Sequence, residues 1–213
     1  MQITILGSTG QVGKAVLIKA LNSGYQVKVL VRTPEKLDAL KEKVEIVKGD
    51  LLDALSVEKA LYGSKVVINA AGGVKEPDQF KKFQQIGKIL GEKMKKQGIT
   101  RLISISGAVS TLPGEKLDFK RKIMKIFVGL FYNQMKQAQD ALLPTIVELK
   151  YIDWTFVRAA MISKNPGTGE VLADDKKMPG TKIMLEDLGQ FIVEQITSTD
   201  WIKKAPLVAS KIS

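Results

Sequence analysis

The chain has 213 residues, of which 45% are hydrophobic and 26% are charged, a composition typical of a globular protein. It contains neither cysteine nor histidine, which excludes disulfide scaffolds, thiol nucleophiles, Ser-His-Asp triads and His- or Cys-ligated metals, so we expect no metal site. Its net charge of +11 favours an anionic ligand or surface as a partner, although a protein rich in solvated lysines has the same charge.

Strand and helix patterns alternate with short connections through the first half of the chain. In order, the apolar patterns predict a strand at Gln2–Leu6, a helix at Gly10–Asn22, strands at Val27–Val31 and Val44–Val47, a helix at Ala54–Leu61, a strand at Val66–Ala70, a helix at Asp78–Lys96 and a strand at Leu102–Ile105. In the long helix we place Phe80, Phe83 and Ile86 on the apolar side. This alternation predicts an α/β fold, a Rossmann-type doubly wound parallel sheet.

The pattern weakens after Gly107. Further elements are predicted as a helix at Tyr132–Leu143, a strand at Trp154–Val157, a helix at Leu185–Ile196 and an edge strand at Pro206–Ala209. No repeat or linker divides the chain, so we predict a single domain over 1–213 with a small C-terminal substrate-side lobe. Residues 108–131 and 163–182 are the expected substrate-side insertions.

A GxxGxxG run, from Gly7 to Gly13, lies between the first predicted strand and the first predicted helix. Glycine permits positive φ and lets backbone approach a pyrophosphate closely, and the start of a helix offers unpaired N–H groups. Glycine spacing alone is weak evidence. Its place between a strand and a helix indicates dinucleotide binding rather than a purely structural turn.

The second predicted strand ends at Arg32, where NAD-binding proteins usually carry an acidic residue and NADP-binding proteins an arginine. A guanidinium can form two charge-assisted hydrogen bonds with a 2′-phosphate, which favours NADP(H). Glu35 follows and could accept from a ribose hydroxyl, so NAD(H) stays possible. An arginine that is merely solvated is the structural alternative.

Five segments together resemble the atypical short-chain dehydrogenase/reductases. More narrowly, the chain is similar to the NAD(P)-binding group that includes biliverdin reductase B (flavin reductase) and the nitrogen-metabolite-repression-regulator-like proteins. The segments are GSTGQVG from Gly7, VLVR ending at Arg32, GDLLD at Gly49–Asp53, INAAGG ending at Gly73 and WTFVRAAMI at Trp154–Ile162. The resemblance covers nearly the whole chain except the basic stretch around 115–131.

The resemblance implies a cofactor site assembled from separate stretches of the chain. The pyrophosphate would contact Gly7, Ser8, Thr9, Gly10, Gln11 and Val12, and the 2′-phosphate would contact Arg32. The adenine would lie at Asp50 and Leu51, and the adjoining ribose at Ala70, Ala71 and Gly72. The nicotinamide would lie beside Ser106, Gly107, Ala159, Ala160, Met161 and Ile162. The chain departs from the biliverdin-reductase-B-like pattern at Gly107 and Met161, where those proteins have a serine and a histidine.

Tyr132 and Lys136 form a YxxxK pattern, which places both side chains on one side of a helix. The resemblance implies that Lys136 contacts the nicotinamide ribose and that Tyr132 donates a proton. Ser106 is the third candidate catalytic residue, since its hydroxyl could orient a substrate carbonyl. Alternatively, Tyr132 packs in the core beside Phe131, and Ser106 only satisfies backbone groups.

The basic and apolar stretch 116–131 can be read in three ways: as a flap over the substrate, as a peripheral membrane or partner-binding helix, or as a surface helix docked on its own core. Nucleic-acid binding is disfavoured because no base-reading module is present. No signal peptide or apolar run of about 18 residues is found, so we expect a cytoplasmic protein without a transmembrane segment. The oligomeric state stays open.

Two functions follow. The first is an NADPH-dependent oxidoreductase that transfers a hydride to a small carbonyl, quinone or flavin-like substrate, with the cofactor supplying the difficult chemistry. The alternative is a non-catalytic NADP(H)-binding regulator that senses redox state.

Overall fold

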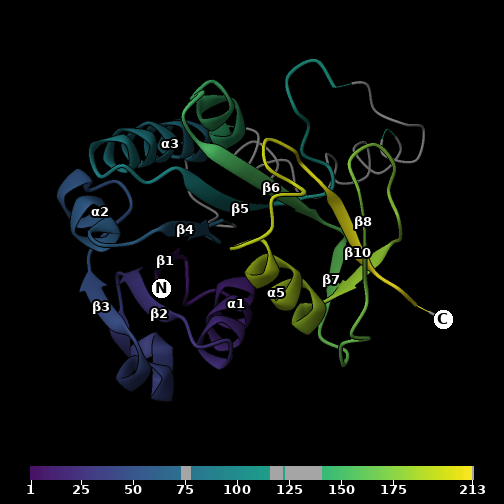
Figure 1. Cartoon of the computed structure of the whole chain (residues 1–213), viewed down its shortest axis with the longest axis horizontal. Helices are drawn as coiled ribbons and strands as arrows, with labels where there is room; N and C mark the ends of the chain where they lie inside the picture. The colour runs from purple at the N-terminus through teal and green to yellow at the C-terminus, as the bar shows by residue number, and fades with distance from the viewer. Residues whose placement is uncertain (73–77, 116–121, 123–140, 213) are drawn as a thin grey trace.

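The computed structural model describes residues 1–72, 78–115, 122 and 141–212, and it shows a central sheet with helices on both faces (Figure 1). In this part of the chain, eight strands follow the order β3-β2-β1-β4-β5-β6-β10-β8. Their pairing is parallel except between β10 and β8, which are antiparallel. The strands are β1 (Gln2–Leu6), β2 (Gln26–Val31), β3 (Glu45–Lys48), β4 (Val66–Asn69), β5 (Arg101–Gly107), β6 (Asp153–Ala159), β8 (Val171–Asp174) and β10 (Leu207–Ser210).

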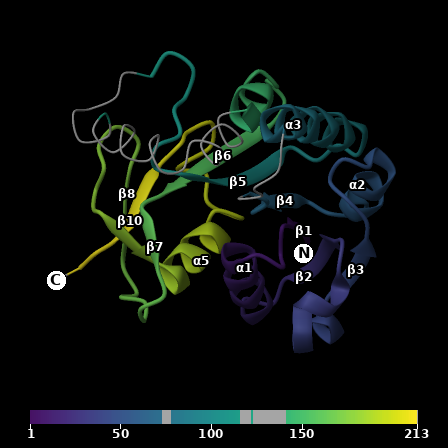
Figure 2. The same cartoon turned by 180° about the vertical axis from the view of Figure 1, so that it is seen from behind.

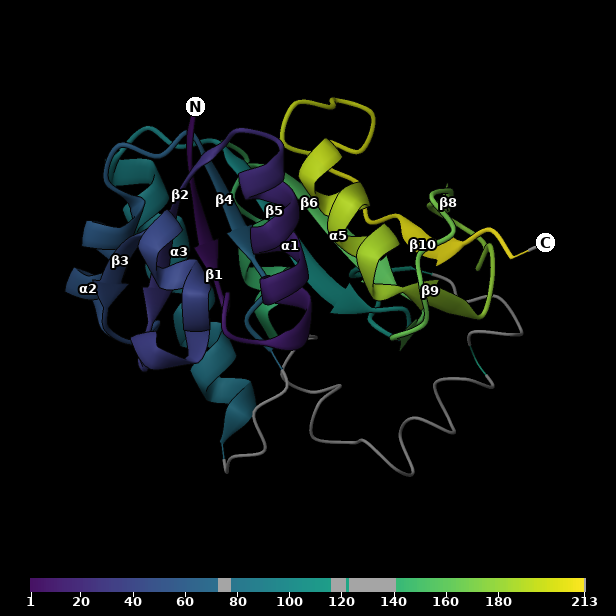
Figure 3. The same cartoon turned by 90° about the horizontal axis from the view of Figure 1, so that it is seen from below.

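The helices lie in two layers, one on each side of the sheet. Helices α1 (Gln11–Asn22) and α5 (Leu185–Glu194) pack against each other on one face, and α2 (Ala54–Leu61) and α3 (Gln79–Lys96) lie together on the other (Figures 2 and 3). Residues 141–147 are also helical and pack with α3. A 3-10 segment, η1 (Pro34–Lys43), follows β2 and is broken at Asp38, where φ is 51°.

Two hydrophobic cores fill the space between the sheet and its helices. Successive strand side chains point to opposite faces, so neighbouring residues of one strand enter different cores. Ile103 of β5 packs in the core that contains α1 and α5, whereas Leu102 packs in the core that contains α2 and α3. Burial on both faces explains why these strands are apolar runs rather than alternating ones.

The predicted fold class is confirmed: the sheet is doubly wound and Rossmann-like, with strand order 3-2-1-4-5-6 in its main part. The five strands predicted before Gly107 are all present within two residues of the predicted ends.

The carboxyl-terminal part differs from the prediction. The strand expected at the edge, β10, lies inside the sheet between β6 and β8. The segment 163–182, expected to form part of a substrate-side lobe, contributes β8 to the main sheet. Strands β7 (Met161–Ser163) and β9 (Lys182–Met184) form a separate two-stranded parallel sheet. Strands this short are placed by distant pairing partners rather than by their own residues, which is why the pattern did not locate them.

Across the ranges described above, no helix combines the length and the apolar character needed to cross a membrane.

Candidate functional site

A cavity of about 770 Å³ opens at the carboxyl ends of β1 to β4. Strand order reverses between β1 and β4, and such a switch point is where doubly wound sheets bind ligands. The cavity is lined by Gly7, Thr9, Gly10, Leu30, Val31, Arg32, Gly49, Asp50, Leu51, Leu52, Asp53, Ala70, Ala71, Gly72, Gln79, Lys82, Phe83 and Ile86. The structure thus brings together nine of the residues that the sequence nominated for the cofactor.

The glycine turn forms one wall of the cavity and cannot tolerate side chains at two positions. Gly7 has φ +76°, and a Cβ there would lie 2.5 Å from the backbone nitrogen of Ala71. A Cβ on Gly13 would lie 2.1 Å from the Gly7 carbonyl oxygen, which in turn accepts a 3.0 Å hydrogen bond from the Gly10 amide. Helix α1 therefore begins directly against the end of β1, as close backbone approach to a phosphate requires.

Arg32 stands at the rim of the cavity, where β2 ends, with its side chain 67% exposed. Its Nε lies 3.9 Å from Oδ2 of Asp50, too far for a hydrogen bond. Asp50 is itself fixed, because its Oδ1 accepts a 2.8 Å hydrogen bond from the Leu52 amide. The Arg32 guanidinium is thus only loosely held and keeps donors for an anionic ligand.

The opposite wall comes from α3, and sequence reasoning missed its polar members, Gln79 and Lys82. Phe80, predicted to face inward, is instead exposed, while Gln79, Phe83 and Ile86 share the buried face. The prediction therefore assigned the wrong residue to the buried side of α3, because spacings of four and three residues place Gln79, Phe83 and Ile86 on one side. That spacing, starting at Gln79, was the available signal.

Gln79 is 5% exposed, and among the residues that the structure describes neither its Nε2 nor its Oε1 has a hydrogen-bond partner. Buried side-chain amides are nearly always hydrogen-bonded, so this one calls for an explanation.

The other nominated residues lie outside the cavity lining. Ser106, at the end of β5, and Ser8 are both buried, and their hydroxyls have no hydrogen-bond partner among the described residues. The structure places Gln11 and Val12 at the start of α1, pairs Gly107 with Ala159 between β5 and β6, buries Ala160 next to β6, and exposes Met161 and Ile162 on β7. Tyr132, Lys136 and nearly all of the basic stretch 116–131 lie outside the described residues.

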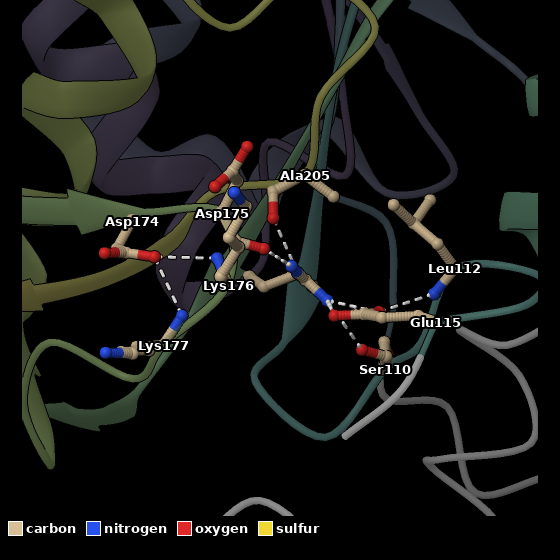
Figure 4. Close-up of polar contacts among 9 residues, drawn as sticks. Ser110, Leu112, Glu115, Asp174, Asp175, Lys176, Lys177 and Ala205 are labelled. Atoms are coloured by element: carbon tan, nitrogen blue, oxygen red, sulfur yellow. Dashed lines mark hydrogen bonds and ion pairs between the residues drawn. The ribbon is translucent and has the colours of Figure 1, made fainter. Parts of the chain in front are cut away.

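A buried ion pair connects several chain segments in the part of the protein beyond β5. Arg158 of β6 is fully buried, and its Nη1 donates to both carboxylate oxygens of Glu115, at 2.8 and 2.7 Å. Its Nε donates to the Ala205 carbonyl at 2.7 Å and its Nη2 to the Asp175 carbonyl at 3.2 Å. Figure 4 shows these groups gathered from three separate segments. The arginine of the WTFVRAAMI segment therefore joins chain segments and does not face the cavity.

Comparisons with known proteins identify the family of the chain. A family model described as NAD(P)H-binding matches residues 7–199. The photosystem II assembly factor Ycf39 of Trieres chinensis is 39% identical over 72 residues, which cover 33% of this chain and 23% of that protein. The phenylcoumaran benzylic ether reductase Pyrc5 of Pyrus communis is 36% identical over 89 residues, covering 38% of this chain and 29% of the reductase. The chain thus matches less than a third of the length of either relative.

Among solved structures, the oxidoreductase ylbE of Lactococcus lactis superimposes with a TM-score of 0.80 at 20% identity, covering 100% of this chain and 92% of the other. At that identity the likeness establishes the shared fold. The family match extends from the glycine turn through α5, over the cavity and both helical layers. This chain accordingly belongs to the NAD(P)H-binding family, and its fold is Rossmann-like.

Proposed function

We propose that this protein is an NADPH-dependent reductase that transfers a hydride to a small carbonyl, quinone or flavin-like acceptor. One observation carries the proposal: Arg32, loosely held and exposed, stands at the end of β2 on the rim of a cavity that the glycine turn closes. In this fold that position selects between the two pyridine coenzymes.

The residues present fit the cofactor. Gly7 and Gly13 leave the backbone clear for a pyrophosphate at the start of α1. The Arg32 guanidinium can form two charge-assisted hydrogen bonds with a 2′-phosphate. Asp50 opposes such a phosphate through its charge, but the Leu52 amide holds one of its oxygens and offsets part of that charge.

When bound, NADPH supplies the hydride. The chain's own contribution is to orient the acceptor, exclude water and provide a proton. We assign the first task to Ser106, because its buried hydroxyl at the end of β5 has no hydrogen-bond partner among the residues that the structure describes. As the sequence predicts, Tyr132 would donate the proton and Lys136 would hold the nicotinamide ribose. The reductase relative from Pyrus communis supports reduction as the reaction class.

Coenzyme binding and NADPH oxidation test the proposal directly. Wild-type protein should bind NADPH more tightly than NADH in calorimetry and should oxidise NADPH with at least one member of a panel of aldehydes, quinones and flavins. Arg32→Ser should weaken NADPH binding by about a hundredfold, since two charge-assisted hydrogen bonds are lost, and should leave NADH binding nearly unchanged. Lys36→Ser, an exposed neighbour in η1, is the matched control. A wild-type preference for NADH would contradict the proposed coenzyme.

A second function is a non-catalytic NADP(H)-binding regulator. It is favoured by Gly107 and by the exposed apolar Met161, which offer no polar side chain where the biliverdin-reductase-B-like proteins carry one. The relative named as a photosystem II assembly factor points the same way. Tight NADPH binding without turnover over the whole panel, with a binding partner recovered in only one redox state, would support the regulator over the reductase.

A further inference from the structure

Helix α3 is strongly basic. It contains no arginine and a single acidic residue, Glu92, within its 18 residues. Its lysines are Lys81, Lys82, Lys88, Lys93, Lys95 and Lys96. Much of the chain's net charge of +11 therefore lies on this one helix.

Three of these lysines, Lys81, Lys88 and Lys95, form a stripe along the exposed side of the helix. They are seven residues apart, which is close to two helical turns, so their side chains lie on one side and follow one another at intervals of about 10 Å. The opposite side of α3, with Phe83 and Leu90, is buried in the hydrophobic core. The helix itself lies at the periphery of the fold (Figure 1). The lysine stripe therefore faces away from the sheet.

The lysine stripe has no acidic partner within the described part of the chain. Lys93 and Lys96, on the flank toward α2, form ion pairs with an acidic residue of that helix. No ion pair joins the stripe to Glu92 or to another carboxylate of the described residues. Lys95 lies over the ring of Tyr151, with its Nζ 5.7 Å from the ring centroid. The three ammonium groups are thus available to an anionic partner.

The composition of this side of α3 fits a phospholipid surface. Lysines are compact point charges that suit a diffuse layer of anionic headgroups, whereas recognition of nucleic acids and of single carboxylates favours arginine, which α3 lacks. Phe80, next to Lys81, is 43% exposed, so an apolar side chain stands at one end of the stripe and can enter the headgroup boundary. We propose that the outer side of α3 docks on an anionic phospholipid bilayer.

This docking leaves the cavity open. Phe83 and Ile86 line the cavity from the buried side of α3, and the three lysines of the stripe are absent from that lining. A bilayer on the outer side of the helix therefore does not cover the coenzyme site. The proposal accordingly stands apart from the proposed reductase activity.

Vesicle flotation without coenzyme tests the proposal. Wild-type protein should bind vesicles of phosphatidylcholine mixed with phosphatidylglycerol and should not bind vesicles of phosphatidylcholine alone. The triple variant Lys81→Gln, Lys88→Gln, Lys95→Gln should bind the anionic vesicles about a hundredfold more weakly, because each lysine close to such a surface contributes about fivefold in affinity. Added salt should weaken the binding of the wild type.

The matched control removes the same charge elsewhere. Lys43→Gln, Lys164→Gln and Lys177→Gln together replace three exposed lysines outside α3. Because solvent screens exposed charges beyond about 10 Å, this variant should bind the anionic vesicles within about threefold of wild type. Phe80→Ser should weaken binding by about fivefold, since its apolar contact with the bilayer is lost.

Equal losses in the two triple variants would overturn the proposal, because net charge rather than the stripe would then drive binding. Wild-type protein that ignores anionic vesicles would do so too, as would tighter binding to duplex DNA through the same three lysines. Circular dichroism checks that the variants fold, which is expected because the substituted positions are exposed and glutamine is a good helix former. Since coenzyme is left out, none of these results bears on the proposed reductase activity.

Discussion

Arg32, at the end of β2, and Arg158, near the end of β6, show that two parts of the sheet use their polar groups differently. One part, here called the cavity side, is β1 to β4, and the other, the far side, lies beyond β5. Arg32, on the cavity side, has a side chain 67% exposed, and its Nε lies 3.9 Å from Oδ2 of Asp50. Arg158, on the far side, is fully buried and bonded to Glu115 and to the backbone carbonyls of Ser110, Asp175 and Ala205. The first arginine keeps its hydrogen-bonding capacity for a ligand, and the second uses it inside the protein.

The same division extends beyond the arginines. On the cavity side the buried Gln79 amide has no hydrogen-bond partner in the described part of the chain, whereas on the far side Asp187 accepts hydrogen bonds from Thr168, Gly169 and Ser210. Unpaired groups at the cavity should therefore govern ligand affinity, and paired groups beyond β5 should govern stability. Substitutions in the two regions are expected to separate these two properties.

The largest effect on stability is expected at Arg158. Arg158→Met removes a buried guanidinium together with the hydrogen bonds that it donates to the Glu115 carboxylate and to several carbonyls, so unfolding free energy should fall by about 3–5 kcal/mol. Urea denaturation measures this, with Arg32→Ser as the matched variant, expected to change stability by less than about 0.5 kcal/mol. Equal losses in the two variants would break the distinction between the regions.

A smaller loss is expected at Asp187. Asp187→Asn keeps one acceptor oxygen but turns an NH₂ group toward N–H and O–H donors, so stability should fall by about 2 kcal/mol. Burial raises the pKa of Asp187, but hydrogen bonds from Ser210, Thr168 and Gly169 bring that pKa below its ordinary value of 3.8. The carboxylate therefore contributes its stability above about pH 3.8 and loses it as the pH falls further, and the variant should lack this dependence. Glu186→Gln, an exposed neighbour, serves as the control.

The smallest effect is expected at Glu58, which joins α2 to α3 near the surface. Hydrogen bonds from Lys93 and Lys96 lower the pKa of Glu58 from 4.5 to about 2. Its contribution is complete above about pH 4.5 and declines as the pH falls toward 2. The difference in unfolding free energy between wild type and Glu58→Gln should shrink over that range and with added salt. A difference that does not vary with pH would show that the ion pairs contribute nothing.

Much of the fold was accessible from the sequence because the first five strands are apolar runs paired with their neighbours in a regular α/β alternation. Strands β7, β8 and β9 were not found, since each has only three or four residues and depends on a distant partner. Strand β10 was found but misplaced, because a local pattern does not reveal which strands lie on either side of it.

The site was predictable where backbone geometry determines it. The glycine turn, Arg32 and the Ala70–Gly72 stretch all line the cavity, and each follows a strand whose end is fixed by the sheet. Gln79 was missed because a glutamine at the start of a lysine-rich helix looks like a surface residue, and its burial depends on how α3 packs in the folded protein. The roles of Tyr132 and Lys136 stay predictions.

The position of β10 has a consequence for how the protein is made. Among the strands described, β8 pairs only with β10, and β10 is inserted between β6 and β8. A ribosome releases residues 171–174 before residues 207–210, so the nascent β8 has no sheet to join until β10 emerges. The cavity side, built from β1 to β4, can assemble much earlier. Translation thus completes the part of the sheet around the cavity first and leaves β8 dependent on a strand that is synthesised after it.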